Sequence, residues 1–412
     1  MRHIRTIAGV LVLLLFPGPP GSPAAVKAGT PLALVGGTVY AGPADPPLFD
    51  ATVVLADGKI AAVGPRGKVA VPAGAAVIDC AGTAILAGFQ NSHVHFTEEK
   101  WMGAAQQDPA RLAAHLVDMV TRFGFTTVVD TASSLDNTVP LRRRIASGEV
   151  AGPRILTAGE GLYPPQGVPY YVRDTLPASV VEGLPQPSTA GEAARVVRQH
   201  VEGGADALKL FTASWVARGK VLPMPAEVAA AAAAEMHKRG KLVIAHASNV
   251  AGLRVALDAG VDILAHAIDD SRGLTAADRA RMRQQNVAII PTLILFEKAR
   301  YLFDVLDEVR GHARSGGEIL FGTDVGYLSS YDPTPEYVLL AGSGLGWREI
   351  LAALTTSPAA RFGDAGTRGK ISPGMDADLV VLGADPVRDV RAFANVRHTI
   401  RAGALIYSRT GP

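Results

Sequence analysis

Most of the chain alternates short apolar runs with longer stretches of helical period, and this alternation restricts the folds it can adopt. Short runs rich in β-branched residues predict buried strands, and the longer stretches predict helices. Eight such strands can be counted in order: ILAGF (85–89), TTVVDT (126–131), RILTAG (154–159), ALKLF (207–211), LVIAHA (242–247), ILAHA (263–267), AIIPTL (288–293) and EILFGTD (318–324). Strand–helix repetition of this kind predicts an α/β fold, a (β/α)8 TIM barrel.

The two chain ends lack the helical period and are expected to form a second, smaller unit. Strands are predicted in 32–42, 51–64 and 75–88, and again in 376–382 and 396–408. A single helix over 348–363 is expected to close the barrel. The ends should therefore join in a small composite β-sandwich domain. The expected parts are a signal peptide (1–28), a first β-domain part (29–87), a (β/α)8 barrel (88–365) and a second β-domain part (366–412).

The first residues have the pattern of an export signal. Arg2 and Arg5 precede the apolar run TIAGVLVLLLF (6–16), and small residues and prolines follow it. The run is too short for a comfortable membrane span, so we expect cleavage within 22–28, no membrane span afterwards, and a periplasmic or secreted protein. A retained anchor helix is the alternative. With Cys80 as the one cysteine, no internal disulfide is expected.

Charge and composition limit the classes of partner that the protein is expected to bind. The formal net charge is +2 and only 19% of residues are charged, which argues against nucleic acid as a partner. Apolar residues make up 48% of the chain, enough for a sizeable core. We expect a small-molecule substrate, and a homo-oligomer remains open.

The tripeptide His93-Val94-His95 stands at the end of the first predicted barrel strand. Side chains at i and i+2 of a strand point to the same side, so two imidazoles should converge. Neutral imidazole is the commonest metal ligand in proteins. Two unrelated packing histidines are the alternative for this motif alone.

Further polar side chains end other predicted strands. Lys209 lies in the fourth strand, His246 and His266 end the fifth and sixth, and Asp324 ends the eighth. Taken singly, Lys209 could extend from a strand end, the histidines could be core residues, and Asp324 could cap a turn. Catalytic groups of barrel enzymes collect at the carboxyl ends of the strands. Together with His93 and His95, these residues therefore predict one metal site.

The residue types suit a hydrolytic centre. Histidine and carboxylate bind zinc (Zn2+), which lowers the pKa of a bound water from about 15.7 to about 7. Asp324 would act as general base. Lys209, buried among cations, can lose its proton and add carbon dioxide, and the carbamate can bridge two ions. We therefore predict one ion on His93, His95 and Asp324 and a second on His246 and His266, with Lys209 bridging; a one-metal site is the alternative.

These residues and their flanking segments resemble the amidohydrolase superfamily, in particular its imidazolonepropionase-related and Xaa-Pro dipeptidase-like branch. The resemblance rests on GFQNSHVHF (88–96), GADALKLF (204–211), VIAHASNVAGLRVALDAGVDILAHA (243–267), ILFGTDVG (319–326) and ISPGMDADLVVLGADPV (371–387). It implies a distorted barrel and the ligand roles given above.

Three positions depart from patterns common in that superfamily. Asn91 stands where an Asp usually precedes the first metal histidine, Ser248 replaces a Tyr common in dipeptidase-like members, and Asn249 replaces the Glu typical of deaminases. Asn91 suggests a less anionic surrounding for His93. Ser248 weakens the expectation of dipeptidase activity, and Asn249 weakens that of deamination.

The sequence therefore predicts a metal-dependent amidohydrolase that cleaves a C–N amide-type bond with a metal-activated hydroxide. An N-acyl amino acid, a dipeptide or a cyclic amide is the expected substrate. An esterase or lactonase using the same site, or a non-catalytic metal- or ligand-binding barrel, are the alternatives. Ordinary loop packing is the alternative for each of the candidate substrate contacts, which are Tyr163, Tyr170, Tyr171, Trp215 and Arg218.

Overall fold

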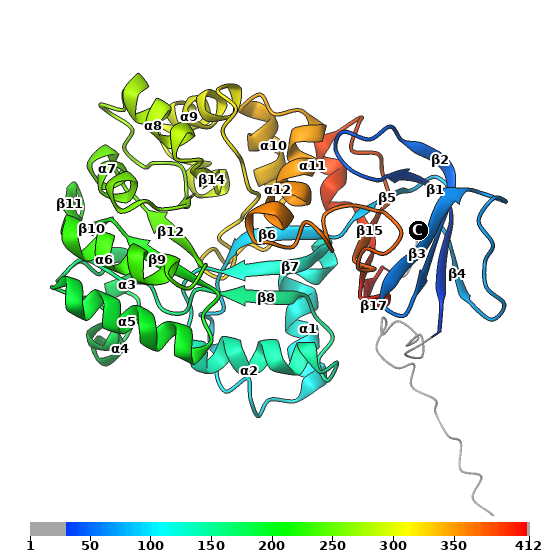
Figure 1. Cartoon of the computed structure of the whole chain (residues 1–412), viewed down its shortest axis with the longest axis horizontal. Helices are drawn as coiled ribbons and strands as arrows, with labels where there is room; N and C mark the ends of the chain where they lie inside the picture. The colour runs from blue at the N-terminus through cyan, green and yellow to red at the C-terminus, as the bar shows by residue number, and fades with distance from the viewer. Residues whose placement is uncertain (1–29, 410–412) are drawn as a thin grey trace, which may run out of the picture.

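A computed structural model of the chain describes residues 30–409 and is shown in Figure 1. The predicted signal peptide lies outside these residues. The part of the molecule with most of the helices occupies one side, and a sheet coloured blue and red, from both ends of the chain, occupies the other. Among residues 30–409, no helix combines the length and apolar character needed to cross a membrane.

The strand predicted at ILAGF (85–89) is wrong in its bounds, because residues 85–87 lie in β5 (Ala84–Ala87) of the sheet formed by the chain ends, and the barrel strand begins only at Phe89. Together with the six strands predicted after it, this barrel strand forms two parallel sheets. The first contains β6 (Phe89–Val94), β7 (Phe125–Asp130) and β8 (Arg154–Thr157). The second contains β9 (Ala207–Phe211), β12 (Leu242–His246), β13 (Ile263–Ala265) and β14 (Ala288–Ile290). Nearly all of these residues are buried, as expected for parallel strands covered on both faces. The mixed α/β fold is therefore confirmed.

The eighth predicted strand, 318–324, makes only single bridges. Ile319 pairs with Ile289 and Val325 pairs with Val94, so this segment runs between β14 and β6. A further bridge from Leu162 to Leu210 joins the chain after β8 to β9. Asp324 has a φ of 57°, in the left-handed region, which interrupts a regular strand. Closure into a regular eight-stranded barrel stays a prediction.

The helices surround these sheets and begin at residues suited to capping. Thr189 caps α5 in a capping box with Glu192, Thr275 does the same for α8 with Asp278, and Asn249 caps α7. The bounds are α1 (Pro109–Met119), α2 (Leu135–Ala146), α5 (Ala190–Gly203), α6 (Ala226–His237), α7 (Val250–Ala259), α8 (Ala276–Gln284), α9 (Leu302–Arg314) and α10 (Thr334–Gly342), with short helical turns η1 (Glu99–Trp101), η2 (Thr121–Phe123), η3 (Leu293–Phe296) and η4 (Val390–Ala394).

The single helix expected over 348–363 is two helices, so that expectation is wrong in detail. These are α11 (Trp347–Leu354) and α12 (Thr356–Arg361). Thr355 between them has φ −135° and ψ −78°, outside the helical region. Pro358 lacks the N–H that an unbroken helix would direct at the Leu354 carbonyl, which explains a break at this point.

Two long connections after β8 and β9 contain small elements. The Pro-rich stretch 163–189 includes α3 (Tyr170–Arg173) and α4 (Ala178–Gly183). The stretch 212–225 contains an antiparallel hairpin of β10 (Ala213–Ala217) and β11 (Lys220–Pro223). Both follow the carboxyl ends of parallel strands.

The two chain ends meet in one mixed sheet of eight strands. The strand order is β17-β16-β15-β5-β1-β2-β3, and β4 pairs with β1 off this path. The bounds are β1 (Leu32–Tyr40), β2 (Leu48–Ala56), β3 (Lys59–Pro65), β4 (Ala76–Asp79), β5 (Ala84–Ala87), β15 (Leu379–Leu382), β16 (Val396–Arg401) and β17 (Ala404–Ser408). A second facing sheet, the domain boundaries and thus the sandwich stay predictions.

Candidate active site

Three polar side chains meet at the end of β6. The Nε2 atoms of His93 and His95 lie 3.2 Å apart. Asp324 Oδ1 lies 3.1 Å from His93 Nε2 and 2.8 Å from His95 Nε2. All three side chains are buried. The strand alternation expected for His93 and His95 thus brings both imidazoles onto one carboxylate oxygen.

The Asn91 side chain forms hydrogen bonds that link the segments carrying His93 and Asp324. Its amide Nδ2 donates to Thr323 Oγ1 (2.8 Å), and its Oδ1 accepts from the His93 backbone N–H (3.1 Å). The Asp324 backbone N–H donates to the His93 carbonyl at 2.9 Å. Asn91 therefore joins the segment that carries Asp324 to the strand that carries His93.

Gly326 shows how closely these segments approach. Its φ is +97°, and a Cβ there would lie 1.9 Å from the His95 carbonyl oxygen.

Gly326→Ala should destabilise the fold by about 2–4 kcal/mol, because overpacking adds to left-handed strain, and should lower metal content by displacing His95. Gly316→Ala is the control, since its φ is +82° and nothing lies within 4 Å. Urea unfolding and elemental analysis measure both effects; equal stabilities would contradict this account.

Lys209, His246 and His266 lie beside the group formed by His93, His95 and Asp324. The ring of His266 is 4.6 Å from that of His93 and 4.9 Å from that of His246, centroid to centroid. Parallel pairing of β9 with β12 sets His246 opposite Phe211. Phe211 stacks on His246 at 4.8 Å and lies 5.5 Å from Lys209 Nζ. All six side chains predicted as ligands are therefore buried in one neighbourhood.

Hydrogen bonds indicate which ring nitrogen of His246 and which of His266 is free. Ser248 Oγ donates to the Ala213 carbonyl (2.9 Å), so it accepts from His246 Nε2, 3.1 Å away. Thr292 Oγ1 donates to the Pro291 carbonyl (2.8 Å), so it accepts from His266 Nδ1, 2.6 Å away. This assignment leaves the lone pairs of His246 Nδ1 and His266 Nε2 for a ligand.

Burial sets the charge of these groups. Burial, and then the charge of Lys209, lowers the pKa of His93 to about 3, and the same two causes lower that of His246 to about 3. Burial opposes ionisation of Asp324, but its contacts with His93 and His95 outweigh burial and hold its pKa well below the usual value. Burial also lowers the pKa of Lys209 to about 8. At neutral pH His93 and His246 are thus neutral and Asp324 is ionised, as metal ligands require.

The donor set fits a divalent cation. Asp324 Oδ1 is buried and accepts no hydrogen bond of acceptable geometry from the described residues. It and one nitrogen from each of His93 and His95 all lie within 4.8 Å of one another. A cation between them would satisfy all three lone pairs, and two imidazoles with a carboxylate are ligands typical of zinc.

Asp130 is a neighbour of the site that the sequence analysis did not single out. It ends β7, is fully buried, and accepts from Ser133 Oγ (2.5 Å) and Thr157 Oγ1 (2.7 Å). Burial raises its pKa, and the electrostatic effect of the neighbouring His95 opposes that shift. Its position at the end of the TTVVDT strand was the available signal.

The five candidate substrate contacts lie in different elements and differ in their exposure. Tyr163 is buried and stacks on Phe211 with centroids 4.4 Å apart. Tyr170 and Tyr171 begin α3, and Trp215 lies in β10. Arg218 is exposed in the turn of the β10–β11 hairpin. Their roles stay predictions.

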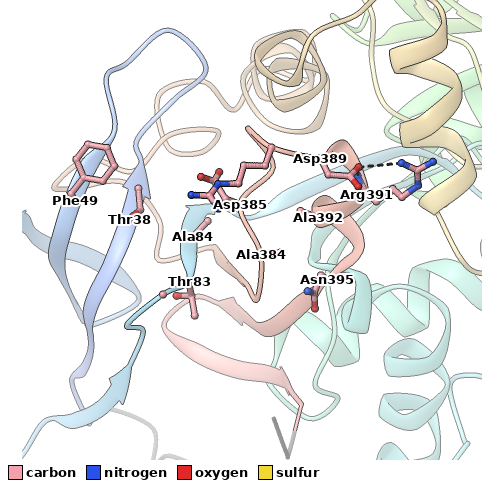
Figure 2. Close-up of a pocket in the computed structure, with 12 residues that line it drawn as sticks. Thr38, Phe49, Thr83, Ala84, Ala384, Asp385, Asp389, Arg391, Ala392 and Asn395 are labelled. Carbon is pink, nitrogen blue, oxygen red and sulfur yellow. Dashed lines mark hydrogen bonds and ion pairs between the residues drawn. The ribbon is translucent and has the colours of Figure 1, made fainter.

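A separate hollow lies between the sheet formed by the chain ends and the segment 384–395. Figure 2 shows its lining, which includes Thr38, Phe49 and Asp385, with an ion pair between Asp389 and Arg391. None of the six predicted ligands lines it. This hollow is therefore distinct from the candidate active site.

Comparisons with known proteins agree with the geometry. The amidohydrolase family model matches residues 84–406. The imidazolonepropionase of Thermoplasma acidophilum is 33% identical over 99 residues, which are 23% of this chain and 24% of that protein. The matched region therefore spans about a quarter of that relative's length.

Solved structures are similar over nearly the whole chain. A protein from Bifidobacterium longum, identified as a candidate prolidase, has 27% identity and a TM-score of 0.76, covering 93% of this chain and 96% of its own. A Xaa-Pro dipeptidase with bound methionine has 23% identity and a TM-score of 0.78, covering 92% of this chain and 100% of its own. The second likeness, at this identity, concerns the fold alone. Because the family model covers well over half of the chain, the protein belongs to the amidohydrolase family and is an enzyme acting on carbon–nitrogen bonds.

Proposed function

We propose that the protein is a metal-dependent hydrolase of an amide bond in an N-acyl amino acid, a dipeptide or a cyclic amide. The observation that carries this proposal is the convergence of His93, His95 and Asp324 on one point, with Lys209, His246 and His266 beside them. The prolidase-like structural neighbours support an amide rather than a ring-deamination substrate. Esters and lactones are secondary candidates.

The metal complement we propose is two zinc ions. His93, His95 and Asp324 would hold one, and His246 and His266 the other through the nitrogens left free by Ser248 and Thr292. Bound zinc supplies an activated water and polarises the substrate carbonyl.

Lys209 is the residue proposed to join the two ions. Burial lowers its pKa to about 8, so a fraction of the amine is neutral at physiological pH. The Nζ lone pair can attack carbon dioxide, and loss of one N–H proton to solvent leaves an anionic carbamate.

Asp324 is proposed to move the proton during hydrolysis. Its low pKa keeps it ionised, so it can accept a proton from the attacking water and deliver it to the leaving nitrogen. Burial of the surrounding side chains limits access of bulk water to that transfer.

At the level of the whole chain, we propose a distorted (β/α)8 barrel carried beside the composite β-domain. The single bridges at Ile319, Val325 and Leu162 support closure between the two parallel sheets. Export after removal of residues 1–28 remains our proposal from the sequence.

The proposal is tested by screening zinc-reconstituted protein against N-acyl amino acids, dipeptides, cyclic amides, esters and lactones. Turnover of at least one amide class is expected, with kcat/KM at or above about 10⁴ M⁻¹s⁻¹ for a good substrate. If only esters or lactones are turned over, the protein is an esterase or lactonase. If no substrate class is turned over, a binding protein is favoured.

A further inference from the structure

A carboxylate outside the metal-ligand group stands at the edge of the site. Asp269 follows His266 by three residues in the loop after β13. The adjacent Asp270 backbone N–H donates to the Ser248 carbonyl (3.1 Å), so this loop is joined to the one that follows His246. Trp215 Nε1 donates to Asp269 Oδ2 at 2.7 Å. Asp269 therefore lies where the connections after β9, β12 and β13 meet.

Asp269 lacks a cationic partner among residues 30–409. Among the described residues, the Asp269 carboxylate accepts one hydrogen bond, from Trp215, and forms no ion pair. The nearest basic side chain in sequence, Arg272, pairs with Asp270 at 2.6 Å instead. Burial raises the pKa of Asp269 to about 6, which still leaves it mainly ionised at neutral pH. A half-buried carboxylate with one oxygen free favours a positively charged ligand.

Tyr171, Tyr301 and Tyr327 lie within the electrostatic reach of this carboxylate. Tyr171 lies edge-on to Tyr170 (centroids 5.5 Å apart) and to Tyr327 (5.9 Å). Burial, and then the negative charge of Asp269, raises the pKa of Tyr171 and of Tyr301. Tyr327 and Tyr301 are 50% and 41% exposed, so their rings reach solvent.

The same tyrosines connect Asp269 with the metal-ligand group. Tyr327 follows Asp324, and its backbone N–H donates to the Asp324 carbonyl at 3.2 Å. After burial, the charges of both Asp324 and Asp269 contribute to the raised pKa of Tyr327 and of Tyr171. These two rings thus lie within the electrostatic reach of both carboxylates.

We propose that Asp269, with Tyr170, Tyr171, Tyr301, Tyr327 and Trp215, binds a cationic side chain of the substrate. This inference rests on the proposed amide hydrolysis and deepens it, because it names lysine- or arginine-containing dipeptides and N-acyl amino acids as the preferred class. Aromatic faces attract ammonium and guanidinium groups, and the free Asp269 oxygen accepts their hydrogen bonds. An acidic substrate side chain would meet an uncompensated like charge.

The experiment compares Ala-Lys, Ala-Met and Ala-Glu, which have side chains of similar length, on zinc-reconstituted protein. The wild type should show a kcat/KM for Ala-Lys at least about tenfold above that for Ala-Met, and lowest for Ala-Glu. Asp269→Asn should reduce the Ala-Lys to Ala-Met ratio about tenfold, mainly through KM. Tyr327→Leu, at a half-exposed ring, should reduce the same ratio. Asp270→Asn is the matched control and should keep it, because Asp270 already pairs with Arg272.

Equal turnover of Ala-Lys and Ala-Met by the wild type, or a ratio that survives Asp269→Asn, would overturn the inference. Absence of any amide turnover would instead overturn the proposed function. In that event calorimetric binding of free lysine and norleucine decides the inference: tighter binding of lysine that Asp269→Asn abolishes supports it, and equal binding of the two rejects it.

Discussion

Asp324→Asn is expected to lower kcat by about 10²–10⁴-fold, the range that general acid–base groups contribute. The amide keeps the size of the side chain but neither carries the negative charge nor accepts a proton. Both imidazoles approach Asp324 Oδ1, at 3.1 and 2.8 Å, so the substitution also weakens a metal ligand. Steady-state kinetics on the substrate found by screening measures the loss.

Metal content separates the two reasons for that loss. A variant that retains its zinc but does not turn over has lost the proton carrier, and one that loses zinc has lost a ligand. Asp57→Asn is a suitable control, because Asp57 is exposed in the β2–β3 turn with a φ of 49° that asparagine tolerates. A kcat unchanged in Asp324→Asn would contradict the assigned role.

Removal of metal is expected to abolish turnover and to lower the melting temperature. A ligand that binds only the folded state adds about 4.1 kcal/mol at a concentration 1,000 times its Kd, and the buried histidines and Asp324 would lose that contribution. Activity and melting temperature should return when zinc is added. Full activity after exhaustive chelation would refute the metal-dependent mechanism.

The number of ions tests the role of Lys209 separately. Two zinc ions per chain, with the intact protein heavier by one carbon dioxide on Lys209, are expected from the bridging carbamate. One ion per chain with an unmodified lysine would reject the two-metal version. It would leave the group of His93, His95 and Asp324 as a one-metal site.

The parallel strands and the buried side chains at their ends could be predicted because they follow from local rules. Apolar runs between helical stretches predict buried parallel strands, and β9, β12, β13 and β14 pair in that way. Alternation along a strand places His93 and His95 on one side. Short-range pattern and the common direction of the strands were sufficient for this part of the candidate site.

Other features depend on contacts between distant segments and were not predictable. Asp324 lies in a left-handed backbone stabilised by its hydrogen bond to His93, so 318–324 is not a regular strand. The end of the TTVVDT strand was a signal for Asp130, but its place beside Val94 depends on the register of β7 against β6. The partner of Trp215 is Asp269, 54 residues away, and no local pattern specifies that pair.

The pairing of β5 with β15 has a consequence for biosynthesis. β5 ends at Ala87, and its antiparallel neighbour does not begin until Leu379. As the ribosome elongates the chain, one edge of β5 therefore has no native partner until nearly the entire polypeptide has emerged. Exposed strand edges promote aggregation, and sequence-distant pairing slows folding. A nascent chain arrested before residue 379 should therefore depend on chaperones far more than the finished protein does.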